Sequence, residues 1–459
     1  MAHAFGMDRR VRRHEQTTGD SERRALQNEA LQLSADTGPA RSGFDFAFHD
    51  SRACTARVAP QEQLSDNGGT SWHEVRNLGV PEPVHREEVM NSSTDRKIRY
   101  AVMGLGNIAQ VAVLPAFTHA RENSELVALI SSDAQKLQAL AERYALKITG
   151  SYEDLDRILA SGAIDALYVA TPNTEHRRAL ERAARAGVHV LCEKPLAATV
   201  ADCRSMIQIA SDAQIKLMTA YRLHFEQANL RAVERVRKGE IGEPRLFSSV
   251  FSQQVRPGDI RTRADLGGGA LFDMGIYCVN AARYLFQDEP TEVSAFRVQG
   301  SDPRFANTDE MTSVILRFPR DRIAQFTASH GAAPVSEFRV LGTRGDLHLD
   351  AAYGYHQKSE ETLTIDGKTK ETTTPQHDQF AAELLYFSKC ILEDLEPEPS
   401  GEEGLADVRI LESIVQAAAL GRTITLTPIQ RDQRPNARLE IRKPATSKVE
   451  TVNAPSPSK

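Results

Sequence analysis

A short glycine-containing turn constrains this chain more than any other feature of its sequence. Gly104-Leu105-Gly106-Asn107-Ile108-Ala109 directly follows the apolar run 98–103 and opens a helix-like segment. Two glycines allow a sharp turn and let backbone N–H groups approach a pyrophosphate, while the small Ala109 permits close packing of helix on strand. The phosphate would then lie at the positive end of the helix. Because strand-like and helix-like segments alternate from here to Tyr221, we expect a dinucleotide-binding domain.

Residues 96–221 alternate between short apolar runs and amphipathic segments. Strands are expected at 98–103, 126–130, 165–170, 188–192 and 216–219, and helices at 134–144, 175–186 and 200–213. Strands that are apolar throughout and alternate with helices indicate a parallel sheet covered on both faces. Pro115 should kink the first helix-like segment. The predicted fold of this part is a doubly wound α/β Rossmann domain.

The pattern changes beyond Arg222 to consecutive strand-like runs. Helices are expected at 227–238, 270–286, 377–392 and 404–419, and strands at 244–255, 292–299, 311–318, 323–330, 337–341 and 346–349. Runs of strands without helices between them indicate a mostly antiparallel sheet. We therefore expect residues 222–427 to form an α+β domain with a large open sheet, whose last helices return to the interface between the domains.

Both ends of the chain differ in composition from its middle. Residues 1–95 are polar and lack a sustained period, and residues 428–459 are rich in Pro, Lys and Ser. Such segments bury too little apolar surface to offset their ordering entropy, so we expect a disordered, dispensable leader and a disordered tail. Polar residues follow Arg9-Arg10 where an export signal needs an apolar stretch, which predicts a cytoplasmic location.

Composition excludes several classes of function. A formal charge of −6 and a pI near 6.2 give no basic footprint for nucleic acid. No apolar run approaches the roughly 20 residues that span a bilayer. The histidines are not at metal-ligand spacing, so no metal is assigned. The five cysteines are widely spaced, which predicts small core residues in a reducing compartment; they are Cys54, Cys192, Cys203, Cys278 and Cys390.

Lys194 follows an expected strand, in the sequence Cys192-Glu193-Lys194-Pro195. Ligands of parallel α/β sheets gather beyond the carboxyl ends of the strands, so Lys194 is expected in the crevice where a nicotinamide would lie. Pro195 restricts the conformation of Lys194 and hence the direction of its ammonium group. A surface lysine at the start of a loop is the alternative interpretation.

The second domain contains a glycine-rich stretch, Gly267-Gly268-Gly269-Ala270-Leu271-Phe272-Asp273-Met274-Gly275-Ile276-Tyr277. Glycines let another backbone or a ligand approach closely. In a helix that begins near Ala270, Asp273 and Tyr277 are four residues apart and share one face. A carboxylate and a phenol that enter a cleft together are suited to proton transfer. A glycine-rich loop, a helix cap and a half-buried tyrosine are the alternative.

Two further motifs concern the cofactor. Thr171-Pro172-Asn173-Thr174-Glu175-His176 is expected beside its nicotinamide half, although capping of the next helix explains much of this motif. The second strand ends in Ser131-Ser132, where NAD enzymes usually carry an acidic residue that holds the ribose 2′-OH. The serines leave room for a 2′-phosphate, with whose charge Lys136 is placed to pair. NADP(H) is therefore favoured over NAD(H), and Asp133, an acidic residue near the ribose, is the counter-argument.

Together these motifs resemble the glucose–fructose oxidoreductase / inositol dehydrogenase (Gfo/Idh/MocA) superfamily, most closely its glucose–fructose oxidoreductase branch. The resemblance covers residues 97–425 and includes Tyr221-Arg222 and Ser400-Gly401-Glu402-Glu403-Gly404. It implies a Rossmann domain, a C-terminal domain with an open sheet, and NAD(P)-linked chemistry on sugars or related polyols. It also implies that Lys194, Asp273 and Tyr277 surround the reacting carbon, and that the sheet mediates a homodimer or homotetramer.

One stretch departs from that branch. Asp259-Ile260-Arg261 stands where close relatives often have a Trp-Arg pair, and the single tryptophan of this chain is Trp72. No tryptophan is therefore available at that point to stack on a sugar. Many members of the superfamily also carry His where this chain, like its branch, carries Tyr277.

The sequence predicts an NADP(H)-dependent oxidoreductase that transfers hydride to or from a carbon of a sugar, sugar lactone or polyol. Tyr277 is the expected proton donor or acceptor, Lys194 assists its deprotonation or stabilises the alkoxide, and Asp273 orients the substrate hydroxyl or the lysine. A non-catalytic nucleotide-sensing regulator on the same fold is the alternative. The residues expected to bind the cofactor are Gly104, Leu105, Gly106, Asn107, Ile108, Ser131, Ser132, Lys136, Thr171, Pro172, Asn173, His176, Glu193, Lys194 and Arg222.

Overall fold

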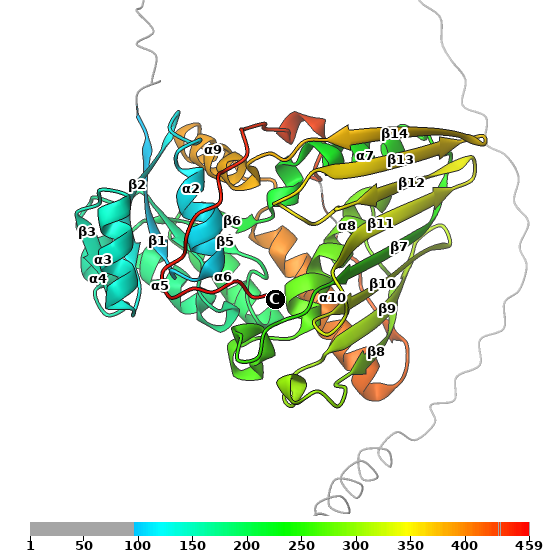
Figure 1. Cartoon of the computed structure of the whole chain (residues 1–459), viewed down its shortest axis with the longest axis horizontal. Helices are drawn as coiled ribbons and strands as arrows, with labels where there is room; N and C mark the ends of the chain where they lie inside the picture. The colour runs from blue at the N-terminus through cyan, green and yellow to red at the C-terminus, as the bar shows by residue number, and fades with distance from the viewer. Residues whose placement is uncertain (1–95, 430, 432, 459) are drawn as a thin grey trace, which may run out of the picture. The chain divides into compact units, whose positions relative to one another are not determined.

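A computed structural model describes residues 96–429, 431 and 433–458 (Figure 1). The predictions for the leader, residues 1–95, and for Cys54 lie outside the described residues. No helix in the described part is long and apolar enough to cross a bilayer.

The first domain is a six-stranded parallel sheet in the order β3-β2-β1-β4-β5-β6. The strands are β1 (Ile98–Met103), β2 (Ser124–Ile130), β3 (Ile148–Gly150), β4 (Ala166–Val169), β5 (His189–Glu193) and β6 (Leu217–Ala220). The strand order reverses between the neighbours β1 and β4. Ligands of doubly wound sheets bind beyond the carboxyl ends of the strands at this point. The predicted Rossmann fold is thus confirmed.

The helices of this domain lie close to their expected positions. They are η1 (Ala109–Val113), α2 (Leu114–Ala116), α3 (Ala134–Arg143), α4 (Leu155–Leu159), η2 (Asn173–Glu175), α5 (His176–Arg185) and α6 (Val200–Asp212). η1 is a π-helical turn immediately before Pro115, whose missing N–H disturbs the regular hydrogen bonding of the helix. The short elements β3 and α4 escaped prediction because so few residues show no clear period.

The second domain contains a nine-stranded sheet in the order β14-β13-β12-β11-β7-β10-β9-β8-β15. The strands are β7 (Pro244–Ser252), β8 (Glu292–Val298), β9 (Met311–Phe318), β10 (Arg322–Ser329), β11 (Val335–Gly342), β12 (Gly345–Asp350), β13 (Ser359–Ile365), β14 (Lys368–Thr374) and β15 (Ile424–Thr425). The pairs are antiparallel except for β7 with β10, which run parallel. The hairpin β13–β14 was not predicted because it is rich in Thr, Glu and Lys and largely exposed.

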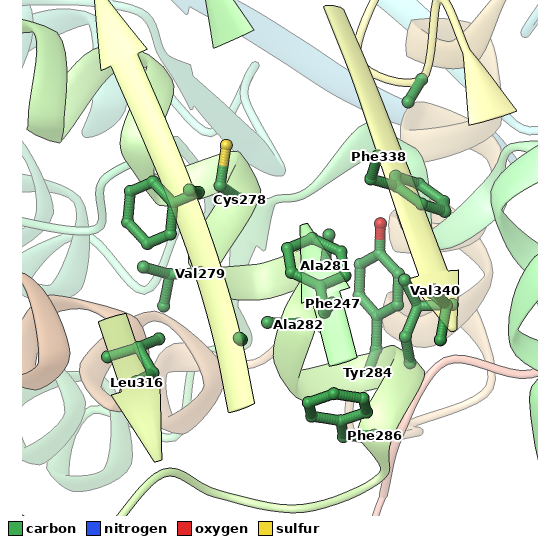
Figure 2. Close-up of a cluster of buried hydrophobic side chains, with 14 of the residues drawn as sticks. Phe247, Cys278, Val279, Ala281, Ala282, Tyr284, Phe286, Leu316, Phe338 and Val340 are labelled. Carbon is green, nitrogen blue, oxygen red and sulfur yellow. The ribbon is translucent and has the colours of Figure 1, made fainter. Parts of the chain in front are cut away.

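Helix α8 (Ile276–Phe286) forms the centre of the second domain's core. It is buried along almost its whole length, and Figure 2 shows aromatic and aliphatic side chains of the sheet, among them Phe247, Phe338 and Leu316, around it. Full burial of one such side chain contributes about 1.5–3 kcal/mol. This packing fixes the helix that carries Tyr277.

The other α-helices in the described part of the chain are α7 (Gln227–Arg237), α9 (Gln379–Leu392) and α10 (Gly401–Leu420). α9 packs on β1 and β2, and α10 lies against both α6 and β8. The hydroxyl of Tyr100, on β1, lies 2.8 Å from that of Ser388, on α9. These last helices therefore join the two domains. The four described cysteines are free and buried, as expected of core residues.

The C-terminal segment has a defined course, contrary to the prediction that residues 428–459 are disordered. A short helix, η8 (Ala437–Leu439), precedes residues 444–458, which we name the C-terminal strap (red in Figure 1). Pro444 pairs with His377 and Ser458 with Val255. The strap has too few apolar residues for a core of its own, but its backbone groups find partners on both folded domains. Composition alone does not reveal such partners.

Candidate active site

A large cavity of about 1250 Å³ lies between the carboxyl edge of the Rossmann sheet and the second domain. Every site residue predicted from the sequence lines it. These are Gly104, Leu105, Gly106, Asn107, Ile108, Ser131, Ser132, Lys136, Thr171, Pro172, Asn173, His176, Glu193, Lys194, Arg222, Asp273 and Tyr277. Residues far apart in the sequence thus meet in one place, as the topology of a doubly wound sheet requires.

We name residues 104–109 the nucleotide fingerprint. Its two glycines meet different constraints. Gly104 has a φ of +93°, and a Cβ there would lie 2.5 Å from the carbonyl oxygen of Ala170. Only glycine therefore allows this turn to pass so close to the end of β4. A Cβ on Gly106 would meet no protein atom within 4 Å. Gly106 borders open space in the cavity, as expected of a glycine that leaves room for a pyrophosphate.

Asp133 caps helix α3 at the adenosine end of the cavity. Its Oδ1 accepts hydrogen bonds from the N–H groups of Gln135 (3.0 Å) and Lys136 (3.1 Å), and the bond from Lys136 lowers the pKa of Asp133. One oxygen of the carboxylate is thus engaged by the helix, and Asp133 also lines the cavity. The ammonium of Lys136 lies 3.8 Å from Asp133 Oδ2, and its side chain lines the cavity.

The loop after β4 is held by residues expected to touch the cofactor. The two ring nitrogens of His176 lie 3.0 Å from the carbonyl oxygen of Thr171 and 3.1 Å from that of Pro195. Burial lowers the pKa of His176, which favours the neutral ring. Asn173 donates a hydrogen bond to the carbonyl of Gly267 at 3.2 Å. Both side chains therefore position loops around the cavity.

Lys194 and Asp273, which both line the cavity, form an ion pair. Lys194 Nζ donates to the backbone carbonyl of Asp273 at 2.7 Å and lies 3.3 Å from its Oδ1. Arg261 Nε donates to Oδ2 at 2.7 Å, and His330 Nε2 lies 3.2 Å from the same oxygen. Burial opposes the charge of this carboxylate, but Arg261 and Lys194 hold the pKa of Asp273 well below its usual range. Of the two roles open to Asp273, this geometry matches orientation of the lysine.

Tyr277 lies between two cations. Its hydroxyl accepts a hydrogen bond from Arg222 at 3.2 Å, and the ammonium of Lys194 lies 4.5 Å from the centre of its ring. Arg222 also donates to Gln379 Oε1 and, at 2.6 Å, to the carbonyl of Tyr353. Arg222, expected among the cofactor contacts, is therefore the direct hydrogen-bond partner of the tyrosine. Tyr277 thus has one cation at its hydroxyl and another over its ring.

Two acids, the half-buried Glu193 and the fully buried Glu383, lie near this constellation. Glu193 accepts a hydrogen bond from the Tyr168 hydroxyl at 3.0 Å, and burial raises its pKa. Glu383, on α9, is fully buried, and neither of its oxygens has a hydrogen-bond partner among the described residues. Burial and the charge of Glu193 raise the pKa of Glu383 well above its usual range. The charge of Arg222 opposes the rise in pKa at both acids, and at Glu193 the charge of Lys194 opposes it more strongly.

Sequence reasoning did not assign Arg261 or His330 to the site. The sequence contained a clue to Arg261, because this residue occupies the arginine position of the Trp-Arg pair common in the branch. It contained no clue to His330, since this residue follows β10 and lies 57 residues from Asp273 in the chain. The ring of Tyr353, 6.0 Å from that of Tyr277, was likewise hidden in an unassigned stretch.

The residues present fit a dinucleotide. The open space at Gly106 matches a pyrophosphate, and Lys136 supplies a cation at the adenosine end. The Thr171 hydroxyl oxygen is buried without a hydrogen-bond partner in the described part of the chain, although its residue lines the cavity. Buried polar atoms are rarely left unpaired, so this hydroxyl suits a polar group of a ligand. The side chain of Asn107, which also lines the cavity, donates to the carbonyl of Ala454 in the strap.

Both domains match the models of one protein family. Residues 98–221 match the oxidoreductase family with NAD-binding Rossmann fold, GFO/IDH/MocA, and residues 229–348 match the GFO/IDH/MocA C-terminal domain. Among individual proteins, a D-xylose 1-dehydrogenase (NADP(+)) of Haloarcula marismortui is 33% identical over 343 residues, which are 73% of this chain and 95% of the relative.

Solved structures agree with this assignment. An aldose-aldose oxidoreductase from Caulobacter crescentus, complexed with glycerol, has a TM-score of 0.69 and 39% identity, and the match covers 72% of this chain and 100% of that one. A 3-ketoreductase from Actinomadura kijaniata, in complex with NADP and TDP-benzene, has a TM-score of 0.65 and 26% identity over 70% of this chain and 98% of that one. With both domains matched and the fold shared, the chain belongs to the GFO/IDH/MocA family of oxidoreductases.

Proposed function

We propose that this chain is an NADP(H)-dependent oxidoreductase that transfers a hydride to or from a carbon of a sugar, sugar lactone or polyol. One observation carries the proposal: Tyr277, with Arg222 on its hydroxyl and Lys194 over its ring, lines the same cavity as the nucleotide fingerprint. A proton donor and a hydride carrier side by side are what reduction of a carbonyl requires. The Haloarcula relative is named as a xylose dehydrogenase and the Caulobacter structure as an aldose-aldose oxidoreductase, which supports the same class.

The choice of NADP(H) is supported by the side chains at the adenosine end. Asp133 and Lys136 both line the cavity, but Asp133 Oδ1 is occupied as the cap of α3, and Lys136 offers a cation to a 2′-phosphate. The names of the Haloarcula relative and of the Actinomadura complex both include NADP. We expect NAD(H) to bind more weakly.

The lining of the cavity on the second domain supports a neutral, hydroxylated substrate. Among its cations, Arg261 is already paired with Asp273 and Asp259, and Arg222 is hydrogen-bonded to Tyr277, Gln379 and Tyr353. Amide side chains donate and accept hydrogen bonds, as hydroxyl groups require, and aromatic rings pack on apolar faces. The side chains of these two kinds include Phe251, Gln253, Gln254, Tyr353, Tyr355 and Gln357.

In the proposed mechanism Tyr277 handles the proton. Bound NADP(H) supplies or accepts the hydride at the substrate carbon. In the reducing direction, the Tyr277 hydroxyl gives its proton to the substrate oxygen, and Arg222 and Lys194 stabilise the negative charge left on the tyrosine. In the oxidising direction, the same oxygen takes the proton from the substrate hydroxyl.

Asp273 and Arg261 position Lys194 in this scheme. The carboxylate of Asp273 stays ionised, because Arg261 and Lys194 hold its pKa well below the usual range in spite of burial. Its oxygens and its backbone carbonyl fix the lysine ammonium beside Tyr277. The lysine is thereby held ready to meet a substrate oxygen as charge develops.

We also propose that the chain forms a homo-oligomer through the outer face of its large sheet. In Figure 1 the helices α7, α8 and α10 lie along one face of this sheet. The other face presents Phe296, 79% exposed, on β8 and Ile315, 50% exposed, on β9. Light scattering of the purified protein and of a Phe296→Asp variant tests this, since the charge should lower the mass if the face is the interface.

A substrate screen tests the proposed function. Purified protein is mixed with NADPH and a panel of aldoses, ketoses, lactones and anhydro-sugars, and with NADP⁺ and polyols, while absorbance of the reduced nicotinamide is followed. Turnover that is lost in Tyr277→Phe supports the proposal. Tight NADPH binding without turnover on any member would instead favour a nucleotide-sensing regulator.

A further inference from the structure

The C-terminal strap lies across the nucleotide fingerprint. Gln110, fully buried in η1, holds Val452 by both backbone groups: its Nε2 donates to the carbonyl at 2.9 Å and its Oε1 accepts from the N–H at 2.7 Å. Asn107 donates to the carbonyl of Ala454 at 3.0 Å. Val452 also packs against the apolar cluster of the Rossmann domain. The strap is thus attached at the helix on which the pyrophosphate would lie.

The strap next passes the adenosine end of the site. The Asn453 side chain donates to Gln135 Oε1 at 2.8 Å and to Asp133 Oδ2 at 3.4 Å. Asn453 has a φ of +47°, a left-handed conformation that asparagine adopts more readily than other residues with a side chain. The chain therefore bends where it touches the loop expected to hold the 2′-phosphate.

The end of the strap crosses to the second domain. Arg256 donates its N–H to the carbonyl of Pro457 at 2.9 Å, and Ser458 pairs with Val255. Residues 446–449 and 456–458 line the cavity together with the fingerprint and the substrate residues. The strap is consequently fixed on both sides of the crevice and forms part of its wall.

The strap covers the crevice without filling it. The cavity measures about 1250 Å³ with the strap in place. Pockets for small molecules and cofactors are typically about 300–1,000 Å³, so room remains for a dinucleotide together with a small substrate. A segment that blocked the site would leave no such space.

We propose that the C-terminal strap is part of the cofactor site and retains bound NADP(H) by closing the adenosine and pyrophosphate half of the crevice. This inference rests on the proposed function, because it takes NADP(H) as the ligand. Release of the nucleotide then requires the strap to detach from Gln110, Asn107 and the second domain. The dissociation rate of the cofactor is therefore set in part by residues 446–458.

Stopped-flow release of NADPH tests the proposal. The full chain, a chain ending at Pro455 and a chain ending at Ala445 are each loaded with NADPH and mixed with excess NADP⁺, and the loss of NADPH fluorescence gives the dissociation rate. The shortest chain should release NADPH about 10-fold faster or more, a change of about 1.4 kcal/mol. The chain ending at Pro455 loses only the contacts with the second domain and should fall between the two.

A point variant keeps the test valid if truncation disturbs folding. Asn453→Ala removes two hydrogen bonds and places alanine in a left-handed conformation, so the strap should loosen without a change in charge. Asn436→Ala, which removes the cap of η8 in the same C-terminal segment, is the matched control. NADPH release should accelerate in the first variant only, with melting temperatures of the nucleotide-free proteins compared in parallel.

Three results would overturn the proposal. Equal release rates in all chains would show that the strap does not retain the cofactor. Slower release from the shortened chains would show that the strap competes with the nucleotide. Failure of the full chain to bind NADPH would overturn the proposed function itself, whereas normal binding with strap-independent release would overturn this inference alone.

Discussion

The guanidinium of Arg222 donates a hydrogen bond to the hydroxyl of Tyr277 at 3.2 Å. Arg222 is 4% exposed, and its other hydrogen-bond partners here are the neutral groups of Gln379 and Tyr353. A buried cation whose direct partners are neutral is stabilised by any negative charge that forms beside it. Arg222 is therefore placed to stabilise negative charge on the tyrosine oxygen in the proposed reaction.

The first prediction concerns Tyr277. Tyr277→Phe should lower kcat about 10²- to 10⁴-fold, as expected for loss of a general acid–base group. NADPH affinity should barely change, since the hydroxyl contacts Arg222 and not the nucleotide fingerprint. Single-turnover kinetics and NADPH titration measure the two effects. A tyrosine that only packs would lose one hydrogen bond, about 1 kcal/mol, and turnover would stay close to normal.

The Rossmann fold was predictable because its strands carry their own signal. β1 (Ile98–Met103) is buried at nearly every position, so its sequence is apolar almost throughout. β14 (Lys368–Thr374) is the opposite case, with lysines, threonines and a glutamate that are mostly exposed. Its pairing with β13 stabilises it as a strand, and pairing is a property of two segments that neither sequence shows alone.

Residues of the candidate site were predictable only where a reactive side chain directly follows a recognisable strand or turn. Lys194 follows β5 directly, and the topology of the sheet brings it to the crevice. His330 reaches Asp273 from the end of β10, in another sheet, and the strap reaches Gln110 from the far end of the chain. Such contacts depend on tertiary packing, which local periodicity does not encode.

A second prediction assigns different roles to the two glycines of the fingerprint, one in folding and one in nucleotide binding. Gly104→Ala should destabilise the protein, because its φ of +93° alone costs alanine roughly 1–3 kcal/mol and its Cβ meets Ala170. Gly106→Ala has free space in the nucleotide-free protein and should leave the melting temperature unchanged. It should weaken NADPH binding by about tenfold or more, that is by about 1.4 kcal/mol. Equal melting temperatures for both variants would contradict this assignment.

A third prediction concerns the choice between the two cofactors. Lys136→Ala removes the cation expected to meet the 2′-phosphate, a charge-assisted bond of about 1.5–3 kcal/mol. The Kd for NADPH should therefore rise about 10-fold or more, while the Kd for NADH stays the same. Asp133→Asn is the matched variant, since asparagine caps a helix as well as aspartate does. A large loss of NADH affinity in Asp133→Asn would instead mean that this carboxylate holds the ribose.

The last prediction concerns Glu383 and the dependence of stability on pH. Glu383 is fully buried, and burial, the charge of Glu193 and, more weakly, that of Asp378 raise its pKa well above the ordinary value of 4.5, against the opposing effect of Arg222. Below pH 4.5 the carboxyl is protonated in both the folded and the unfolded chain, so it carries no penalty. As the pH rises, the unfolded chain ionises first, and the folded state loses stability until the raised pKa is passed.

Glu383→Gln removes this titration and keeps the shape of the side chain. Relative to the variant, the parent protein should lose free energy of unfolding from pH 4.5 upward, by at most about 1.4 kcal/mol per pH unit. Urea unfolding of both proteins between pH 5 and pH 8 measures the difference, and Glu142→Gln on the exposed face of α3 controls for the change in net charge. A constant difference across this range would mean that a cation pairs with Glu383 and keeps it ionised in the folded state.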